Sequence, residues 1–234
     1  MARPLMVKKI PYSYWVAHIA SSESFLWRGD IICVKAGERS FLNPPIFFGQ
    51  LLAARDYPYR KLSWKKCWDA SKYTHTALAN GKYGIIEHYY PKTRKREWED
   101  LIGREFAVIR PLMMYKPEDI YYGKAGLDRV CQIALQDVEN EEPYSVRELF
   151  YYCKWGWKYL RKFLPFPPVP FTTLFKSNSG NVCSGQVWYQ YTRAGWFPQL
   201  PQDSPDRQPE AWYPARFLFD PLFQIRMKVK LVEG

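Results

Sequence analysis

The chain has 234 residues, and its 34 lysines and arginines against 23 aspartates and glutamates give a formal net charge of +11. Aliphatic and aromatic residues make up 47% of the chain, which excludes a disordered protein and predicts a folded core. The length predicts a single domain over residues 1–234. No apolar run reaches the length of about 18 residues that would span a membrane, and the N-terminus lacks the apolar core of a signal peptide, so we expect synthesis in the cytoplasm.

Five cysteines and three histidines limit the chemistry that the chain can carry. The cysteines are irregularly spaced and no CxxC or CxxH pair occurs, so we expect no zinc site, no regular disulfide framework and no cofactor. The positive charge favours an anionic partner, such as nucleic acid, an acidic polymer or a phospholipid surface, without choosing among them.

The first twenty-odd residues show no clear periodicity. The first firm element is a short apolar run, Ile31–Val34, which follows a Gly-Asp turn and predicts a buried strand. An insertion near residues 37–73 comes next. Within it, Trp64 and Trp68 lie four residues apart and indicate a short helix.

Two strands are predicted in the centre of the chain, over Thr74–Ala79 and Tyr83–His88. The Asn80-Gly81-Lys82 segment between them is the strongest short signal for a hairpin. We interpret Lys92–Arg96 as a basic turn, and Glu105–Ile109 as a further strand that a proline ends.

The second half of the chain predicts three helices, one long loop and one strand. Ala125–Val138 has apolar residues at helical spacing, Ser145–Leu164 opens with a capping box, and Val182–Ala194 is a third helical pattern. A proline-rich loop is expected near residues 198–214. The final segment, Gln224–Leu231, alternates polar and apolar residues, which predicts a half-exposed strand with a cationic outer face.

Cys183 differs from the other cysteines in its surroundings. Small, turn-forming residues precede it and a helical pattern follows, so we expect it at the N-terminus of a helix. The helix dipole and the backbone N–H groups at such a position stabilise a thiolate and lower its pKa. The alternative is that Cys183 is a small buried residue, as most free cysteines are.

A thiolate nucleophile needs an imidazole base, and the base needs a third polar group to orient it. His75 lies in a predicted strand, and the facing strand supplies Glu87 or His88. Because strand side chains alternate, only one of these two can point to the same side as His75. A hydrogen-bonded structural histidine is the alternative for His75, and His18, with no acidic or cysteine neighbour, is expected to be structural.

The order of four short motifs resembles the circularly permuted branch of the NlpC-type papain-like peptidases, which includes YiiX-like proteins and the lecithin:retinol acyltransferase group. The motifs are Gly29-Asp-Ile-Ile32, Thr74-His75-Thr-Ala-Leu, Gly84-Ile-Ile-Glu87, and Val182-Cys183-Ser-Gly-Gln-Val-Trp-Tyr-Gln-Tyr191 followed by Ala194-Gly195. That branch places a Gly-Asp strand first, the catalytic histidine and a third polar residue on the next two strands, and the cysteine last, at the start of a helix. The resemblance spans about residues 28–196. It implies an α+β, papain-like fold with an antiparallel sheet packed against helices.

Carried over residue by residue, the resemblance implies Cys183 as nucleophile, His75 as general base and Glu87 as the third member, with His88 as the alternative. We favour Glu87 because it lies twelve residues after His75, as expected for this group, and because a carboxylate stabilises an imidazolium. The backbone N–H of Cys183 would donate to the oxyanion. The implied function is a cysteine hydrolase, or thiol protease, that cleaves a cell-wall-type peptide amide through an acyl-enzyme; the alternative within the same fold is a lipid acyltransferase or thioesterase.

A basic and aromatic segment, Lys154–Lys162, leaves a second class of function open. Three interpretations are open: an ordinary amphipathic helix, an interfacial helix on anionic lipid, and a nucleic-acid groove. The nucleic-acid groove is ranked last because no nucleic-acid motif accompanies the segment. A non-enzymatic binding or assembly module that used this surface would show Cys183 and His75 too far apart or occluded, with the cleft filled by side chains such as Trp188 or Trp196.

Overall fold

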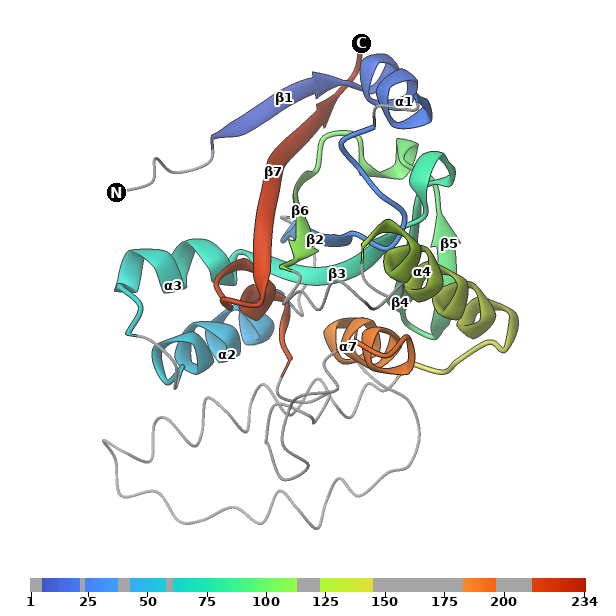
Figure 1. Ribbon diagram of the computed structural model, residues 1–234. Coiled ribbons are helices and arrows are strands. Elements are labelled where there is room, and N and C mark those ends of the chain that lie inside the picture. The colour runs from blue at the N-terminus through green and yellow to red at the C-terminus, as the bar shows by residue number, and fades with distance from the viewer. Residues whose placement is uncertain are drawn as a thin grey trace, which may run out of the picture.

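The computed structural model describes residues 6–21, 24–37, 43–57, 61–112, 123–144, 183–196 and 212–234. Seven strands are present in this part of the chain: β1 (Val7–Pro11), β2 (Ile31–Lys35), β3 (Tyr73–Ala79), β4 (Ile85–Tyr89), β5 (Lys92–Arg96), β6 (Glu105–Pro111) and β7 (Phe223–Val232). They form one sheet in the order β1-β7-β6-β2-β3-β4-β5, shown in Figure 1. Only the pairing of β1 with β7 is parallel among these strands, so the sheet is mainly antiparallel.

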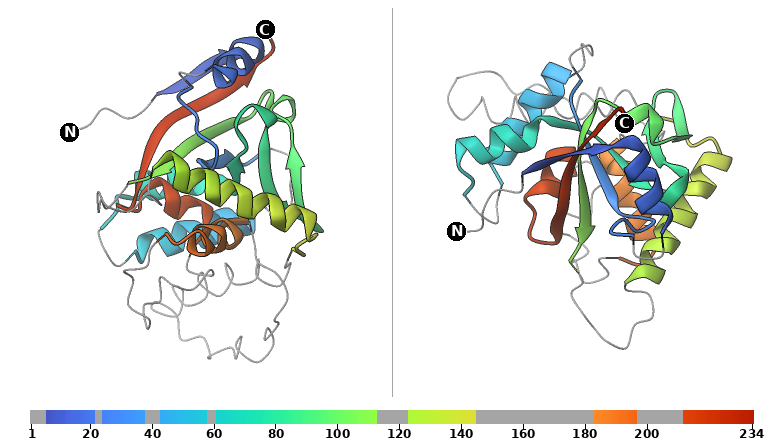
Figure 2. Two further views of the ribbon diagram at one scale, coloured as in Figure 1. Left: turned by 45° about the vertical axis from the view of Figure 1, so that its right-hand side comes forward. Right: turned by 90° about the horizontal axis from the view of Figure 1, so that it is seen from above.

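Five α-helices in the described ranges surround the sheet: α1 (Tyr12–Ala20), α2 (Asn43–Arg55), α3 (Trp64–Ser71), α4 (Lys124–Glu139) and α7 (Cys183–Arg193). Short 3-10 helices are η1 (Gly81–Tyr83), η2 (Glu99–Leu101) and η5 (Pro214–Leu218). Figures 1 and 2 show α4 and α7 beside one another on one side of the sheet, α1 at the end where β1 and β7 finish, and α2 next to α3. The architecture is therefore α+β, as the sequence predicts.

Strand alternation divides the core into two layers. In β2, Ile31 and Cys33 face a cluster that includes Leu127 of α4, whereas Ile32 and Val34 face the opposite layer. Trp15 of α1 is fully buried in that opposite layer. The Ile31–Val34 run is continuously apolar because both faces of this central strand are covered.

Most of the predicted elements that fall in the described ranges are found. The predicted strands Ile31–Val34, Thr74–Ala79, Glu105–Ile109 and Gln224–Leu231 lie within β2, β3, β6 and β7. The predicted helices at Trp64–Trp68, Ala125–Val138 and Val182–Ala194 correspond to α3, α4 and α7. The described parts of the 37–73 insertion form α2 and α3, which share a small apolar core with η5.

One prediction is wrong, and two elements were not predicted. Lys92–Arg96 is not a turn but the edge strand β5, paired with β4 along its whole length. Its side chains at one edge of the sheet reach solvent, which is how a basic sequence can form a strand. The N-terminal residues, where no periodicity is visible, form β1 and α1, because β1 pairs with β7 from the far end of the chain and its stabilising contacts are not local.

The remaining differences concern connections. The hairpin between β3 and β4 exists, but its turn is longer than the Asn-Gly dipeptide suggests and contains η1, so Tyr83 lies outside the strand. The predicted helix Ser145–Leu164, the basic segment Lys154–Lys162 and most of the 198–214 loop lie outside the described residues. At the end of that predicted loop, Trp212 and Tyr213 are buried.

Candidate functional site

The helix that begins at Cys183 is held in place by one buried carboxylate. Asp137 of α4 is fully buried and accepts hydrogen bonds from Gln186 and Gln190 at 2.8 Å and from Arg193 at 2.6 Å. These three donors follow one another at helical spacing along one side of α7. The position of Cys183 relative to the sheet is therefore determined by polar contacts along the length of the helix.

A second anchor explains the Gly-Asp turn before β2. The Tyr191 hydroxyl of α7 donates to the carbonyl oxygen of Gly29 at 2.6 Å. Gly29 has a positive φ of 84°, and a Cβ there would overlap the carbonyl oxygen of Leu127 in α4. The next residue, Asp30, accepts two hydrogen bonds of 2.7 Å from Arg110 of β6. Gly29 thus allows α4 to lie close to the turn before β2, and Asp30 links the start of β2 to β6 through its hydrogen bonds with Arg110.

His75 and Glu87 meet on one face of the sheet. Ala77 of β3 pairs with Glu87 of β4, so Glu87 points to the same face as His75, two residues before Ala77. His75 Nε2 lies 2.9 Å from Glu87 Oε2. His88 points to the other face, where its Nδ1 lies 2.6 Å from the hydroxyl oxygen of Thr93. Of the two candidates for the third position, Glu87 contacts His75 and His88 does not.

Arg94 of β5 holds the Glu87 carboxylate from its other side. Its Nε donates to Glu87 Oε1 at 2.8 Å, and its guanidinium lies 4.5 Å from the ring centroid of Tyr89. Tyr89 in turn contacts the His75 ring edge-on, at 5.7 Å between centroids. These four side chains form a closed ring of contacts that restrains the imidazole.

Cys183 reaches His75 where β3 and β4 separate. Strand β3 pairs with β4 from Ala77 to Ala79. At the end of this paired stretch the backbone N–H of Ala79 points toward β2, and that of Asn80 points the other way and donates to Gly84. Since backbone donors alternate along a strand, the N–H of Thr76 points toward β4, beyond the last paired residue. There it donates to the Cys183 thiol, and the Thr76 hydroxyl donates to Cys183 Sγ at 3.7 Å.

The thiol and the imidazole shift each other's pKa values. Burial lowers the pKa of His75, but the negative charge and hydrogen bond of Cys183, together with those of Glu87, raise this pKa to about 10. Burial raises the pKa of Cys183, but the His75 charge and hydrogen bond and the two Thr76 donors outweigh it and lower this pKa. With Nε2 engaged by Glu87, Nδ1 is the imidazole nitrogen left for the thiol.

Glu87 is the anionic end of this arrangement. Burial raises the pKa of Glu87, whereas its hydrogen bond with His75, the His75 charge and the contacts with Arg94 lower it, and the net value is about 2. The carboxylate is therefore ionised at neutral pH and stabilises the imidazolium. Cys183 is 5% exposed and the His75 side chain is 20% exposed, so the histidine is the more accessible member of the pair.

Two members of the site were not found from the sequence. Thr76 is adjacent to His75 but belongs to the opposite face, and its role depends on the separation of β3 from β4. Arg94 belongs to the Lys92–Arg96 segment; once that segment is recognised as a strand, alternation places Arg94 opposite Glu87. The register of β4 with β5 is the signal that would have found it.

Other side chains considered from the sequence lie elsewhere. His18 packs against Phe25 in α1's layer, at 4.4 Å between ring centroids. Trp188 and Trp196 are buried in the core layer under α4 and α7, where Trp188 stacks on Trp212 at 4.1 Å. The separation of Cys183 from His75 that a non-enzymatic module predicts is not observed, because the two side chains are hydrogen-bonded, although Cys183 itself is buried.

Within the described ranges, no group of three or more histidine, cysteine, aspartate or glutamate side chains could hold a metal ion, and no helix is long and apolar enough to cross a membrane. Comparison of the chain with protein-family models, curated proteins and solved structures gives no match.

Proposed function

We propose that this protein is a cysteine hydrolase with a papain-like, circularly permuted arrangement of its catalytic residues. One observation carries the proposal: the Cys183 thiol, the His75 imidazole and the Glu87 carboxylate form a continuous chain of hydrogen bonds, with pKa shifts that favour the thiolate–imidazolium state. A structural cysteine has no need of an ionised partner, and an isolated buried thiol has a raised pKa rather than a lowered one.

The proposed reaction begins with the thiolate of Cys183. Its sulfur attacks the carbonyl carbon of the substrate and forms a C–S bond, while the carbonyl oxygen becomes an oxyanion. The backbone N–H of Cys183, at the first position of α7, is placed to donate to this oxyanion. His75 then gives its Nδ1 proton to the leaving nitrogen or oxygen, and the bond from that atom to the carbonyl carbon breaks.

The second half of the reaction regenerates the enzyme. Neutral His75 takes a proton from a water molecule, the hydroxide attacks the thioester carbon of the acyl-enzyme, and the acid product leaves as the thiolate re-forms beside the imidazolium. Glu87 remains ionised throughout and orients the ring through Nε2. An alcohol or amine in place of water would make the same site an acyltransferase.

The proposed substrate bond is an amide or an ester, with thioesters counted among the esters. We place the peptide amide of a cell-wall polymer first, because the motif order resembles peptidases that act on such bonds. A lipid ester or thioester is the second candidate, and the exposed aromatic residues of α2 and α3, described below, are the observation that favours it.

The test measures acylation of Cys183. The protein is incubated at pH 7 with an aryl acyl ester, and the modified residue is identified by mass spectrometry of the digested chain. We expect one acyl group on Cys183 in the native chain, none in Cys183→Ala, and a loss of about a hundredfold or more in rate for His75→Ala, in line with the usual effect of removing a general acid or base.

His88→Gln is the matched control, because His88 lies next to Glu87 in the chain but faces away from His75. It should acylate at the rate of the native protein. Acylation of Cys67 or Cys131 as fast as Cys183, or an equal rate in His75→Ala, would refute the proposal. Peptide amide and lipid ester substrates, compared by kcat/KM, then separate the two candidate substrates.

A further inference from the structure

Exposed aromatic side chains gather on α2 and α3. Phe48, Trp64 and Trp68 are 56%, 53% and 48% exposed, respectively. We call these three residues and the half-buried Phe47 the α2–α3 aromatic patch. Large apolar side chains that gather on a surface are a common mark of an interaction site, whereas single exposed ones are ordinary.

The patch is continuous across the two helices. The Phe47 ring lies 5.3 Å from that of Phe48 and 4.7 Å from that of Trp68, between ring centroids. Trp64 is one helical turn before Trp68 on α3. The inner face of α3 is already occupied, since Cys67 and Ala70 are buried in the small core beneath it. The core beneath α3 is therefore formed without the two tryptophans.

Cations accompany the patch. Lys65 and Lys66 are exposed and lie between the two tryptophans in the sequence, and the Arg55 guanidinium lies 4.6 Å from the centroid of the Trp64 ring. The nearest carboxylate along α3, that of Asp69, is bonded to Lys72 at 2.9 Å. The surface is thus both aromatic and positively charged.

We propose that the α2–α3 aromatic patch binds an anionic phospholipid membrane surface. Phe48, Trp64 and Trp68 would enter the head-group region, where tryptophan rings are favoured because they join an apolar body to a polar N–H. Lys65 and Lys66 would lie against the lipid phosphates, which attract basic residues held close to the membrane. The amphipathic character of α3, with a buried face toward the protein and aromatic and basic residues outward, suits a helix that lies in the interface plane.

The ring geometry favours lipid over single-stranded nucleic acid. Nucleic-acid platforms present ring faces on which successive bases stack. Here Phe47 meets Phe48 at 84° and Trp68 at 82° between ring planes, so neighbouring rings are nearly perpendicular. Such a group can enter a head-group layer but offers no row of parallel faces for successive bases.

The location separates this surface from the catalytic residues. Figure 1 shows α2 and α3 side by side, apart from α4 and α7. The membrane proposal uses none of Cys183, His75 and Glu87, so it stands or falls independently of the proposed hydrolase activity. Membrane binding by the patch would nevertheless bear on the choice between peptide and lipid substrates, because α3 leads directly into β3, the strand that carries His75.

The experiment measures sedimentation of the full chain with vesicles. We expect binding to phosphatidylcholine vesicles that contain phosphatidylglycerol, and at least tenfold weaker binding to phosphatidylcholine alone. The double variant Trp64→Ala/Trp68→Ala should bind the anionic vesicles at least tenfold more weakly. Lys65→Glu/Lys66→Glu should lose about thirtyfold or more, given the contribution of each basic residue near an anionic surface.

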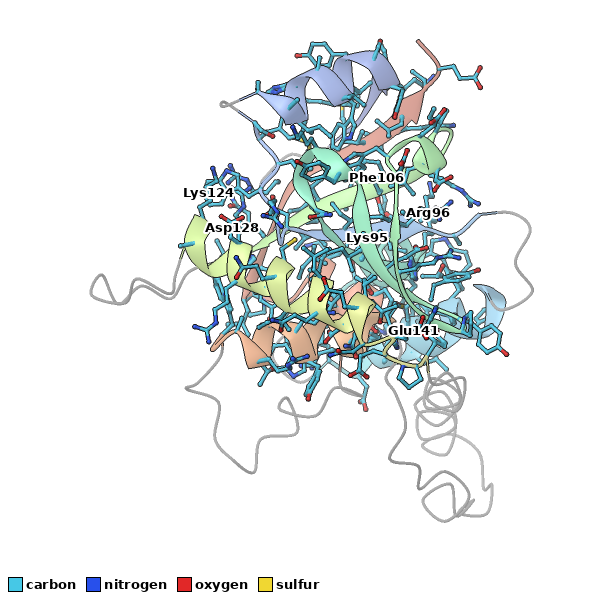
Figure 3. The ribbon with its side chains drawn as sticks, turned by 90° about the vertical axis from the view of Figure 1, so that its right-hand side faces the viewer. Lys95, Arg96, Phe106, Lys124, Asp128 and Glu141 are labelled. Carbon is cyan, nitrogen blue, oxygen red and sulfur yellow. The ribbon has the colours of Figure 1, made fainter. Side chains whose placement is uncertain are left out.

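Two control variants match these changes. Lys95→Glu/Lys124→Glu changes the net charge equally, but Lys95 is on β5 and Lys124 starts α4, as Figure 3 shows. Tyr14→Ala/Tyr83→Ala removes two exposed aromatic rings from other elements. Both controls should bind as the native chain does.

Four outcomes would overturn the proposal. These are no binding of the native chain to anionic vesicles, full binding by the tryptophan variant, an equal loss in the charge-matched control, and a patch-dependent affinity for a single-stranded RNA homopolymer without binding to vesicles. Thermal melting of each variant checks that it is folded, which the exposure of the replaced side chains leads us to expect.

Discussion

Replacing Thr76 with valine should raise the pKa of Cys183 while leaving the shape of the site nearly unchanged. The Thr76 hydroxyl is fully buried and donates to Cys183 Sγ at 3.7 Å. Valine replaces this donor with a methyl group of similar size. The thiolate therefore loses one stabilising contact and keeps the backbone N–H of residue 76 and the imidazolium of His75.

The expected shift follows from the energy of one charge-assisted hydrogen bond. Bonds to charged groups contribute about 1.5–3 kcal/mol, and a long contact to sulfur belongs at the lower end of that range. Because one pKa unit corresponds to about 1.4 kcal/mol, the thiol pKa should rise by about one unit. Below both pKa values, the thiolate fraction should then be about tenfold smaller.

The assay is the rate of alkylation of Cys183 by iodoacetamide as a function of pH, followed by mass spectrometry so that the other thiols are counted separately. The acidic limb of the plot of alkylation rate against pH should move to higher pH by about one unit in Thr76→Val. The plateau at high pH should not change. Thr76→Ser retains the hydroxyl and should follow the native profile. An unshifted limb in Thr76→Val, or an equal shift in Thr76→Ser, would show that the hydroxyl does not stabilise the thiolate.

Three further predictions concern stability, measured by urea denaturation or thermal melting. The pKa of Glu87 is lowered to about 2, so the ionised carboxylate stabilises the fold above its ordinary pKa, and this contribution is lost as the pH falls toward 2. Over that interval the free energy of unfolding of the native chain should fall by up to about 3 kcal/mol more than that of Glu87→Gln. Parallel plots of unfolding free energy against pH for the two proteins would contradict the ion pair. Asp137→Ala removes the acceptor of two buried hydrogen bonds and one partly buried one, and should cost about 3 kcal/mol, against less than about 1 kcal/mol for the exposed Asp69→Ala. Gly29→Ala forces a side chain into a positive φ and onto the Leu127 carbonyl, and should lower the melting temperature by about 4 °C or more; an unchanged melting temperature would show that α4 does not approach as closely as described.

The sequence by itself determined the elements whose signal is local. Alternation identified β7, the Asn-Gly hairpin signal between two apolar runs identified β3, short apolar runs identified β2 and β6, and helical spacing identified α4 and α7, because backbone geometry alone relates residues a few positions apart. The same local reasoning placed Cys183 at the start of a helix. It could not detect β1, whose five residues are held by β7 at the opposite end of the chain.

Strand register decided the third member of the candidate site. The sequence left Glu87 and His88 as alternatives, and one residue of slippage would exchange them, because neighbouring side chains of a strand point to opposite faces. The pairing of Ala77 with Glu87 settles which of the two faces His75. The same register, carried across to β5, brings Arg94 to Glu87.

Only the tertiary structure decided which groups stabilise the thiolate. Thr76 and Cys183 are separated by 107 positions in the chain. Their contact depends on where the pairing of β3 with β4 ends and on the hydrogen bonds of Asp137 and Tyr191 that position α7. The exposed aromatic patch has the same origin, since the spacing of Trp64 and Trp68 predicts a helix but not which of its faces is buried. Spacing along the chain determines what a segment can form, whereas register and packing determine which side chains meet, because those contacts join residues that no local pattern relates.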